Sequence, residues 1–65
     1  MAQELWKART QAVNVESLTN WKSWMKHMTP LGCDYVNGEP RRFYKDVRGY
    51  YYYRVVSESE LHRNK

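Results

Sequence analysis

The segment Thr29-Pro30-Leu31-Gly32 divides the chain into two parts with different side-chain periodicity. Proline cannot continue a helix and glycine permits a turn, so a helix that reaches this segment is expected to end there. Before the segment, apolar residues recur at the three- and four-residue spacing of helices. After it, short runs of β-favouring residues alternate with turn signals. The sequence therefore predicts an α+β fold.

Two helices are expected in the first part of the chain. Residues 3–12 predict the first, in which Leu5 and Ala8 share one face. Residues 14–28 predict a second, stronger helix with Asn14 as its N-cap. The apolar stripe of this second helix consists of Leu18, Trp21, Met25 and Met28. The large aromatic residues expected to form the core, one of them partly exposed, are Trp6, Trp21 and Trp24.

Three strands are expected in the second part, over residues 33–36, 41–47 and 50–56. Asn37-Gly38 is a strong signal for a tight turn between the first two, and Arg48-Gly49 predicts the next turn. Side chains alternate along a strand, so Tyr51 and Tyr53 are expected on the face that packs against the helices.

We expect a single domain over residues 1–65. Residues 57–65 are expected to form a short helical turn, which the capping box Ser57-Glu58-Ser59-Glu60 begins, and a tail that frays over residues 62–65. A chain this short buries only about 60% of its unfolded surface, so a deep catalytic cleft is difficult to build. Cys33 is the single cysteine, which rules out an internal disulfide and favours a cytoplasmic protein. No apolar run resembles a signal-peptide core or a membrane span, so no membrane partner is expected.

The positive charge is concentrated in one aromatic segment. The whole chain carries a net charge of +4. Residues 41–54 alone hold five basic residues against one acidic residue, which is also +4. This pattern favours an anionic partner, either nucleic acid or an acidic protein surface.

Two helices followed by a basic hairpin predict a small winged helix that binds double-stranded DNA. The second helix would enter the major groove, and the hairpin would act as a wing on the minor groove or the backbone. The alternatives are an ordinary solvated helix face and arginines that protect an edge strand. The residues expected to contact DNA are Lys22, Ser23 and Lys26 on the helix, and Asn37, Gly38, Arg41, Arg42, Lys45 and Arg48 on the wing.

The sequence offers little support for an enzyme. His27, Cys33 and His62 match no metal-binding or catalytic spacing, so we expect no catalytic residue, no metal and no cofactor. A small ribonuclease that uses Arg, Tyr and His side chains is the most credible catalytic alternative.

The sequence resembles the phage lambda-type excisionases, which are small winged-helix proteins that direct site-specific recombination. The resemblance covers most of residues 3–47 and lies in Gln3 to Arg9, Leu18 to His27 with Trp24, Pro30, Gly38-Glu39 and Arg42-Phe43-Tyr44. It implies a major-groove role for Lys22, Ser23 and Lys26 and a wing role for Asn37, Gly38, Arg41 and Arg42. It also implies cooperative self-association on bent DNA and contact with a recombinase.

A protein-binding module is the competing interpretation. A small phage-type inhibitor or adaptor would use the same basic aromatic surface to bind an acidic face of a host protein. Exposed Trp6, Tyr50 and Tyr52 away from the arginines would favour this interpretation. A continuous surface joining the lysines of the second helix to the wing arginines would favour DNA.

Overall fold

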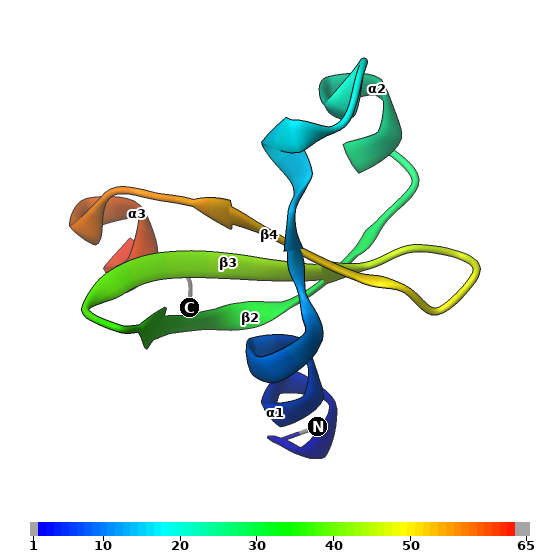
Figure 1. Cartoon of the computed structure of the whole chain (residues 1–65). Helices are drawn as coiled ribbons and strands as arrows, with labels where there is room; N and C mark the ends of the chain where they lie inside the picture. The colour runs from blue at the N-terminus through cyan, green and yellow to red at the C-terminus, as the bar shows by residue number, and fades with distance from the viewer. Residues whose placement is uncertain (1, 64–65) are drawn as a thin grey trace.

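The chain forms a small α+β fold in which a mixed four-stranded sheet is flanked by short helices (Figure 1). The computed structural model describes residues 2–63. The strand order is β1-β4-β3-β2, with β1 parallel to β4 and the other neighbours antiparallel. The elements are α1 (Ala2–Gln11), β1 (Val13–Asn14), the 3-10 helix η1 (Val15–Ser17), α2 (Trp21–Met25), β2 (Thr29–Val36), β3 (Glu39–Lys45), β4 (Tyr51–Val55) and α3 (Glu58–Arg63).

The β2–β3 hairpin has the turn that its sequence predicts. Asn37 and Gly38 both adopt positive φ, at 54° and 79°, as a two-residue hairpin turn with primed geometry requires. The second expected turn, at Arg48-Gly49, joins β3 to β4. The third strand pairs with β3 of the same chain, and it is a central strand because β1 pairs with its other edge.

Strand β2 begins earlier than the sequence suggests. Thr29 to Gly32 were expected to form a turn, but Thr29 pairs with Lys45 and Pro30 pairs with Tyr44. The ladder is irregular between Pro30 and Gly32, which accommodates the proline. Because β2 is an edge strand, the missing proline N–H is tolerated there.

The expected helix over residues 14–28 is wrong. Val13 and Asn14 instead form β1 and pair with Tyr52 and Tyr53, which buries Val15 completely. Asn14 does act as an N-cap, since its side chain accepts a 2.9 Å hydrogen bond from the Glu16 amide, but it caps only the single turn η1. Residue 18 is then extended and residue 20 is left-handed, so only the short helix α2 remains.

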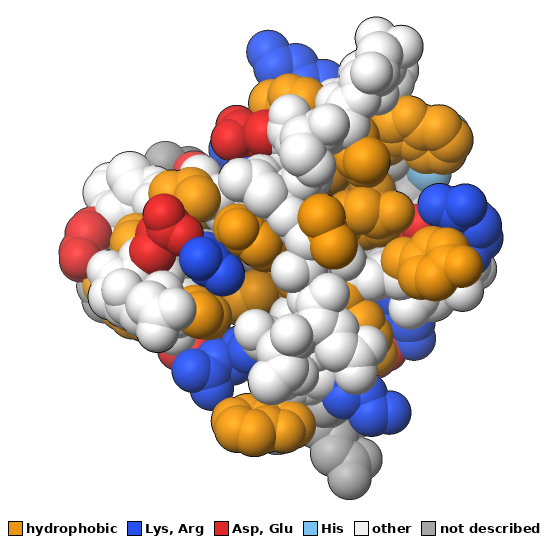
Figure 2. Space-filling view, in the orientation of Figure 1, with side chains coloured by type: hydrophobic (Ala, Val, Ile, Leu, Met, Phe, Trp, Pro, Cys, Tyr) orange, Lys and Arg blue, Asp and Glu red, His pale blue; other side chains and the backbone are white. Residues whose placement is uncertain are grey.

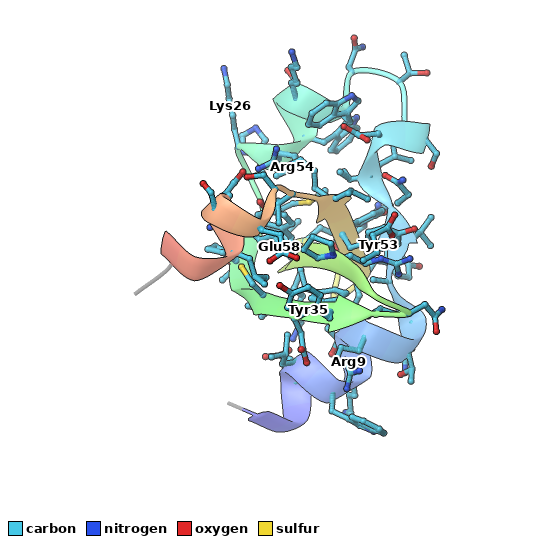
Figure 3. The ribbon with its side chains drawn as sticks, turned by 90° about the vertical axis from the view of Figure 1, so that its left-hand side faces the viewer. Arg9, Lys26, Tyr35, Tyr53, Arg54 and Glu58 are labelled. Carbon is cyan, nitrogen blue, oxygen red and sulfur yellow. The ribbon has the colours of Figure 1, made fainter. Side chains whose placement is uncertain are left out.

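Helices α1 and α3 lie on opposite faces of the sheet. On one face, Leu5 of α1 packs over Gly32 of β2. On the other, the Tyr35 hydroxyl of β2 donates a 2.8 Å hydrogen bond to Glu58 of α3 (Figure 3). The Ser57 hydroxyl caps α3 as predicted, by accepting from the Glu60 amide at 3.1 Å. The expected fraying of residues 62–65 does not extend to residues 62 and 63, which continue α3, whereas residues 64 and 65 lie outside the described residues.

The core is made of smaller residues than expected. Trp6 and Trp24, expected in the core, are 62% and 54% exposed, and only Trp21 is half-buried. Trp6 lies one position away from the sheet-facing residues of α1, and Trp24 lies on α2, beyond the layers formed by α1, α3 and the sheet. The buried apolar residues of the described chain are Ala8, Val15, Phe43, Tyr44 and Val56.

We expect Val15→Ala to lower the free energy of unfolding by about 1–3 kcal/mol, because it removes two methyl groups from a fully buried site. Val13→Ala is the matched control, since Val13 is 53% exposed and its replacement should change stability by less than about 0.5 kcal/mol. Urea unfolding followed by circular dichroism measures both. Equal effects of the two substitutions would contradict the placement of β1 and Val15.

Candidate nucleic-acid interface

The expected wing and the second helix lie at opposite ends of the sheet. Thr29 at the start of β2 pairs with Lys45, and Val36 at its end pairs with Glu39. Helix α2 precedes β2, whereas Asn37-Gly38 follows it. The strand holds eight residues, so its two ends are about 23 Å apart at ~3.3 Å per residue. Lys22, Ser23 and Lys26 therefore do not converge with Asn37 and Gly38.

Arg41 and Arg42 point to opposite faces of the sheet, as consecutive residues of a strand must. The Arg41 guanidinium lies 4.0 Å from the centre of the Tyr53 ring and 2.7 Å from Glu39. Arg42 lies on the α3 side, where its guanidinium is 3.5 Å from Glu60. The paired arginines expected on one wing surface are thus divided, and each is matched by a carboxylate.

Lys45 attaches α1 to the sheet. Its ammonium group forms an ion pair and a hydrogen bond with Glu4 of α1, to which the Tyr51 hydroxyl also donates. The hydrogen bond from Lys45 is the main reason that the pKa of Glu4 is lowered, and the same contact raises the pKa of Lys45. On the other face, Arg54 forms a 2.9 Å ion pair with Glu60 of α3. Arg42, Lys45 and Arg54 therefore bind the chain's own helices, whereas Arg41 is paired within β3.

The turn between β3 and β4 lies at the same end of the sheet as α2, because it follows Lys45, the partner of Thr29. The Asp46 carboxylate organises this turn by accepting 2.9 Å hydrogen bonds from the amides of Arg48 and Tyr50. The Arg48 guanidinium lies 3.1 Å from the same carboxylate and 4.8 Å from the centre of the Tyr50 ring. The turn is thus held in one shape by local contacts.

Two opposing effects act on the pKa of Asp46. Burial of the carboxyl raises the pKa, whereas the hydrogen bonds from the Tyr50 amide and from Arg48 lower it. The lowering effects prevail, so Asp46 has a pKa below its ordinary value. The charged form of Asp46 is therefore the form that the folded turn favours.

Lysines without an ion pair gather on α2. Lys7, Lys22 and Lys26 are the basic residues of the chain between residues 4 and 61 that form no ion pair within that range. Figure 3 shows Lys26 extending outward from the end of the molecule. Lys7 lies on α1, at the opposite end of the view in Figure 1. Two of the three lysines without an ion pair therefore lie on α2, whereas Arg42 and Arg54 of the sheet share the carboxylate of Glu60.

We define the α2-end surface as the exposed side chains of α2, the residues that follow it, and the β3–β4 turn. Figure 2 shows hydrophobic, basic and histidine side chains side by side over these elements, at the right-hand edge. The sequence predicted four of its members as DNA contacts, Lys22, Ser23, Lys26 and Arg48, and it missed Trp24 and His27, which were assigned to the core and to no site. The surface comprises Lys22, Ser23, Trp24, Lys26, His27, Val47, Arg48 and Tyr50.

No group of His, Cys, Asp and Glu side chains that could hold a metal ion occurs among the residues described. In the same part of the chain, no helix has the length and apolar character needed to cross a membrane.

No family model matches the sequence, and neither the curated proteins nor the solved structures contain a match. The proposals below therefore rest on the residues and their geometry.

We expect thermal stability to fall as the pH drops below about 4. Glu4 and Asp46 have lowered pKa values in the folded chain, so each contributes stability above its unfolded pKa of about 4. That stability is lost as the pH falls through the folded pKa. Unfolding midpoints measured between pH 7 and pH 2 test this.

The variant Asp46→Asn should show a smaller loss of stability over this pH range, because it removes one of the two groups. Glu16→Gln is the control, since Glu16 is an exposed carboxylate outside the ion pairs described here. An identical pH dependence for the wild type and Asp46→Asn would show that the carboxylate does not stabilise the turn.

Proposed function

We propose that the protein is a small accessory protein that binds DNA without catalysing a reaction, and that the α2-end surface is its contact. The observation that carries this proposal is the separation of the cations into two groups. The guanidinium and ammonium groups of β3 and β4 are matched by carboxylates, whereas Lys22 and Lys26 are exposed without an ion pair. Cations of this second kind are available to phosphate groups.

The β3–β4 turn takes the place of the wing in this proposal. It lies at the same end of the sheet as α2, and Arg48, with its side chain 62% exposed, is its basic residue. The fixed backbone of the turn reduces the ordering that binding requires. In this proposal the fold acts as a winged helix, and the β3–β4 turn takes the role first expected of Asn37-Gly38.

The length of α2 determines the kind of contact that we propose. Five residues span about 7.5 Å, so α2 presents a single turn to the DNA instead of lying along a groove. Phosphate contacts by Lys22 and Lys26 would then supply most of the affinity. Base contacts that give sequence specificity would come from Ser23 and Arg48. An excisionase-like role, with self-association on DNA and a recombinase as partner, is one form of this function.

A protein-binding adaptor is the second candidate, and the exposed apolar side chains favour it. Val47 is 89% exposed at the tip of the β3–β4 turn, and Trp6 is exposed on α1. The aromatic residues do not form a patch separate from the arginines, however. The Trp6 ring lies 5.5 Å from the Arg9 guanidinium, and the Tyr50 ring lies against Arg48. The lysines of α2 do not form one surface with Arg41 and Arg42, so the DNA proposal rests on Lys22, Lys26 and Arg48 at one end of the sheet.

We expect the double variant Lys22→Ala, Lys26→Ala to weaken binding to all duplexes. It should also reduce the slope of log K against log salt concentration by about 2, because each phosphate contact contributes about 0.9. Fluorescence anisotropy of a labelled random duplex at two salt concentrations measures both quantities. A protein-binding adaptor would show no salt-dependent binding to the duplex.

Two controls separate this contact from charge in general. Lys7→Ala removes an exposed lysine from α1 and should leave the salt slope unchanged. Arg41→Ala with Arg42→Ala should also preserve the slope, since carboxylates already hold both guanidinium groups. A reduced slope in either control, with no reduction in the α2 variant, would refute the assignment of the α2-end surface.

A further inference from the structure

An open surface pocket of about 310 Å³ lies against one side of α2 and the turn that follows it. Its lining residues are Asn20, Ser23, Trp24 and His27. These residues follow the spacing i, i+3, i+4 and i+7, which places them on one helical face. The indole of Trp24 supplies an apolar wall, and it is 54% exposed. The volume lies at the lower end of the range for small-molecule sites, about 300 Å³. The pocket is therefore large enough for one planar ring.

The polar side chains around the pocket have unused hydrogen-bonding groups. Asn20 precedes α2, but its side chain forms no capping hydrogen bond. The Ser23 hydroxyl and the His27 ring likewise form no hydrogen bond with the residues that the structure describes. An amide, a hydroxyl and an imidazole together offer both donors and acceptors to the edge of a ligand.

Backbone hydrogen bonds hold Asn20 in a fixed conformation at the start of α2. Its backbone is left-handed, with φ at 59°. The amides of Ser23 and Trp24 both donate to the Asn20 carbonyl, at 3.1 and 3.2 Å. These contacts fix the backbone of Asn20 relative to the first turn of α2. The pocket is thus bounded by local hydrogen bonds and does not depend on a mobile loop.

Lys26 lies three positions after Ser23, at the flank of the pocket, and supplies positive charge there, whereas Lys22 lies on the other side of the helix. The ammonium group of Lys22 lies 5.6 Å from the centre of the Trp21 ring, which keeps this side chain against the helix. A ligand that satisfies the whole arrangement has a planar aromatic ring, a polar edge and an attached anion. An aromatic side chain of a peptide has no such anion, whereas a nucleotide has all three features.

We propose that this pocket binds one unstacked nucleobase of single-stranded DNA. Trp24 provides the stacking surface, the groups of Asn20, Ser23 and His27 contact the base edge, and Lys26 holds the adjoining phosphate. The proposal rests on the DNA-binding function proposed above, and it names the form of DNA that the surface prefers. In an intact duplex each base is stacked and paired, so its ring is not available to Trp24.

The test compares a fluorescein-labelled oligothymidylate with a labelled duplex, using the full chain and fluorescence anisotropy. Trp24→Ala should weaken binding to the single strand on the order of tenfold, because loss of one stacked base costs about 1–3 kcal/mol. Because Trp24 also belongs to the α2-end surface, duplex binding is expected to weaken as well but by a smaller factor, so the ratio of single-strand to duplex affinity should fall. Trp6→Ala is the matched control, since it removes an exposed tryptophan from α1 and should alter neither affinity.

The variant His27→Ala tests the same pocket without removing the indole of Trp24. It should also weaken single-strand binding selectively. Circular dichroism verifies that each variant is folded. Equal effects of Trp24→Ala on both forms of DNA, or no effect on the single strand, would overturn the pocket proposal. If the Lys22 and Lys26 variant still lost duplex affinity, the proposed function would survive that result. Absence of binding to either form by the wild type would overturn both.

Discussion

The pairing of Val13–Asn14 with Tyr52–Tyr53 determines where every later element lies. This short parallel bridge carries the chain across the edge of β4 and places Val15 in the core. Helix formation in residues 13–20 would remove both contacts, and the cap at Asn14 cannot compensate for that loss. Helix α2 therefore begins later in the chain than expected. It lies at the end of the sheet that holds the β3–β4 turn, and Asn37-Gly38 lies at the opposite end.

The second constraint is that short helices have little apolar surface with which to bind a sheet. Helix α1 contributes Leu5 and the buried Ala8, and then adds ion pairs from Glu4 to Lys45 and from Arg9 to Asp34. Helix α3 is attached mainly through polar contacts of its two glutamates. These contacts use the basic residues that made residues 41–54 resemble an anion-binding segment. Closely spaced arginines in a strand can therefore attach helices to the sheet as well as bind external partners.

Short-range sequence signals predicted the local structure correctly. The predictions failed where residues distant in the sequence compete for the same segment. The Asn37-Gly38 turn and the Ser57 cap depend on two to four residues, and both were predicted. The expected long helix does not form after Asn14 because this segment pairs with β4, almost forty residues later in the chain. The helical periodicity of the sequence could not reveal this distant contact. The division of Arg41 from Arg42 was different, because strand alternation alone separates neighbours. Of the candidate interface, the sequence predicted the lysines of α2 and Arg48, but it grouped Arg48 with Asn37-Gly38, which lies at the other end of the sheet.

The α2-end surface has a composition that stability does not require. A tryptophan on the exposed side of a five-residue helix gains little from burial, and the two lysines beside it have no carboxylate partner among the residues described. Among the described residues, five ion pairs link arginines to carboxylates and a sixth links Lys45 to one, and only the Arg48–Asp46 pair belongs to this surface. The sheet pairs its cations with carboxylates, whereas α2 keeps two unpaired lysines and an exposed tryptophan, and for this reason we propose that a partner binds at that end. This asymmetry, and not the total charge, is the physical basis for placing the partner there.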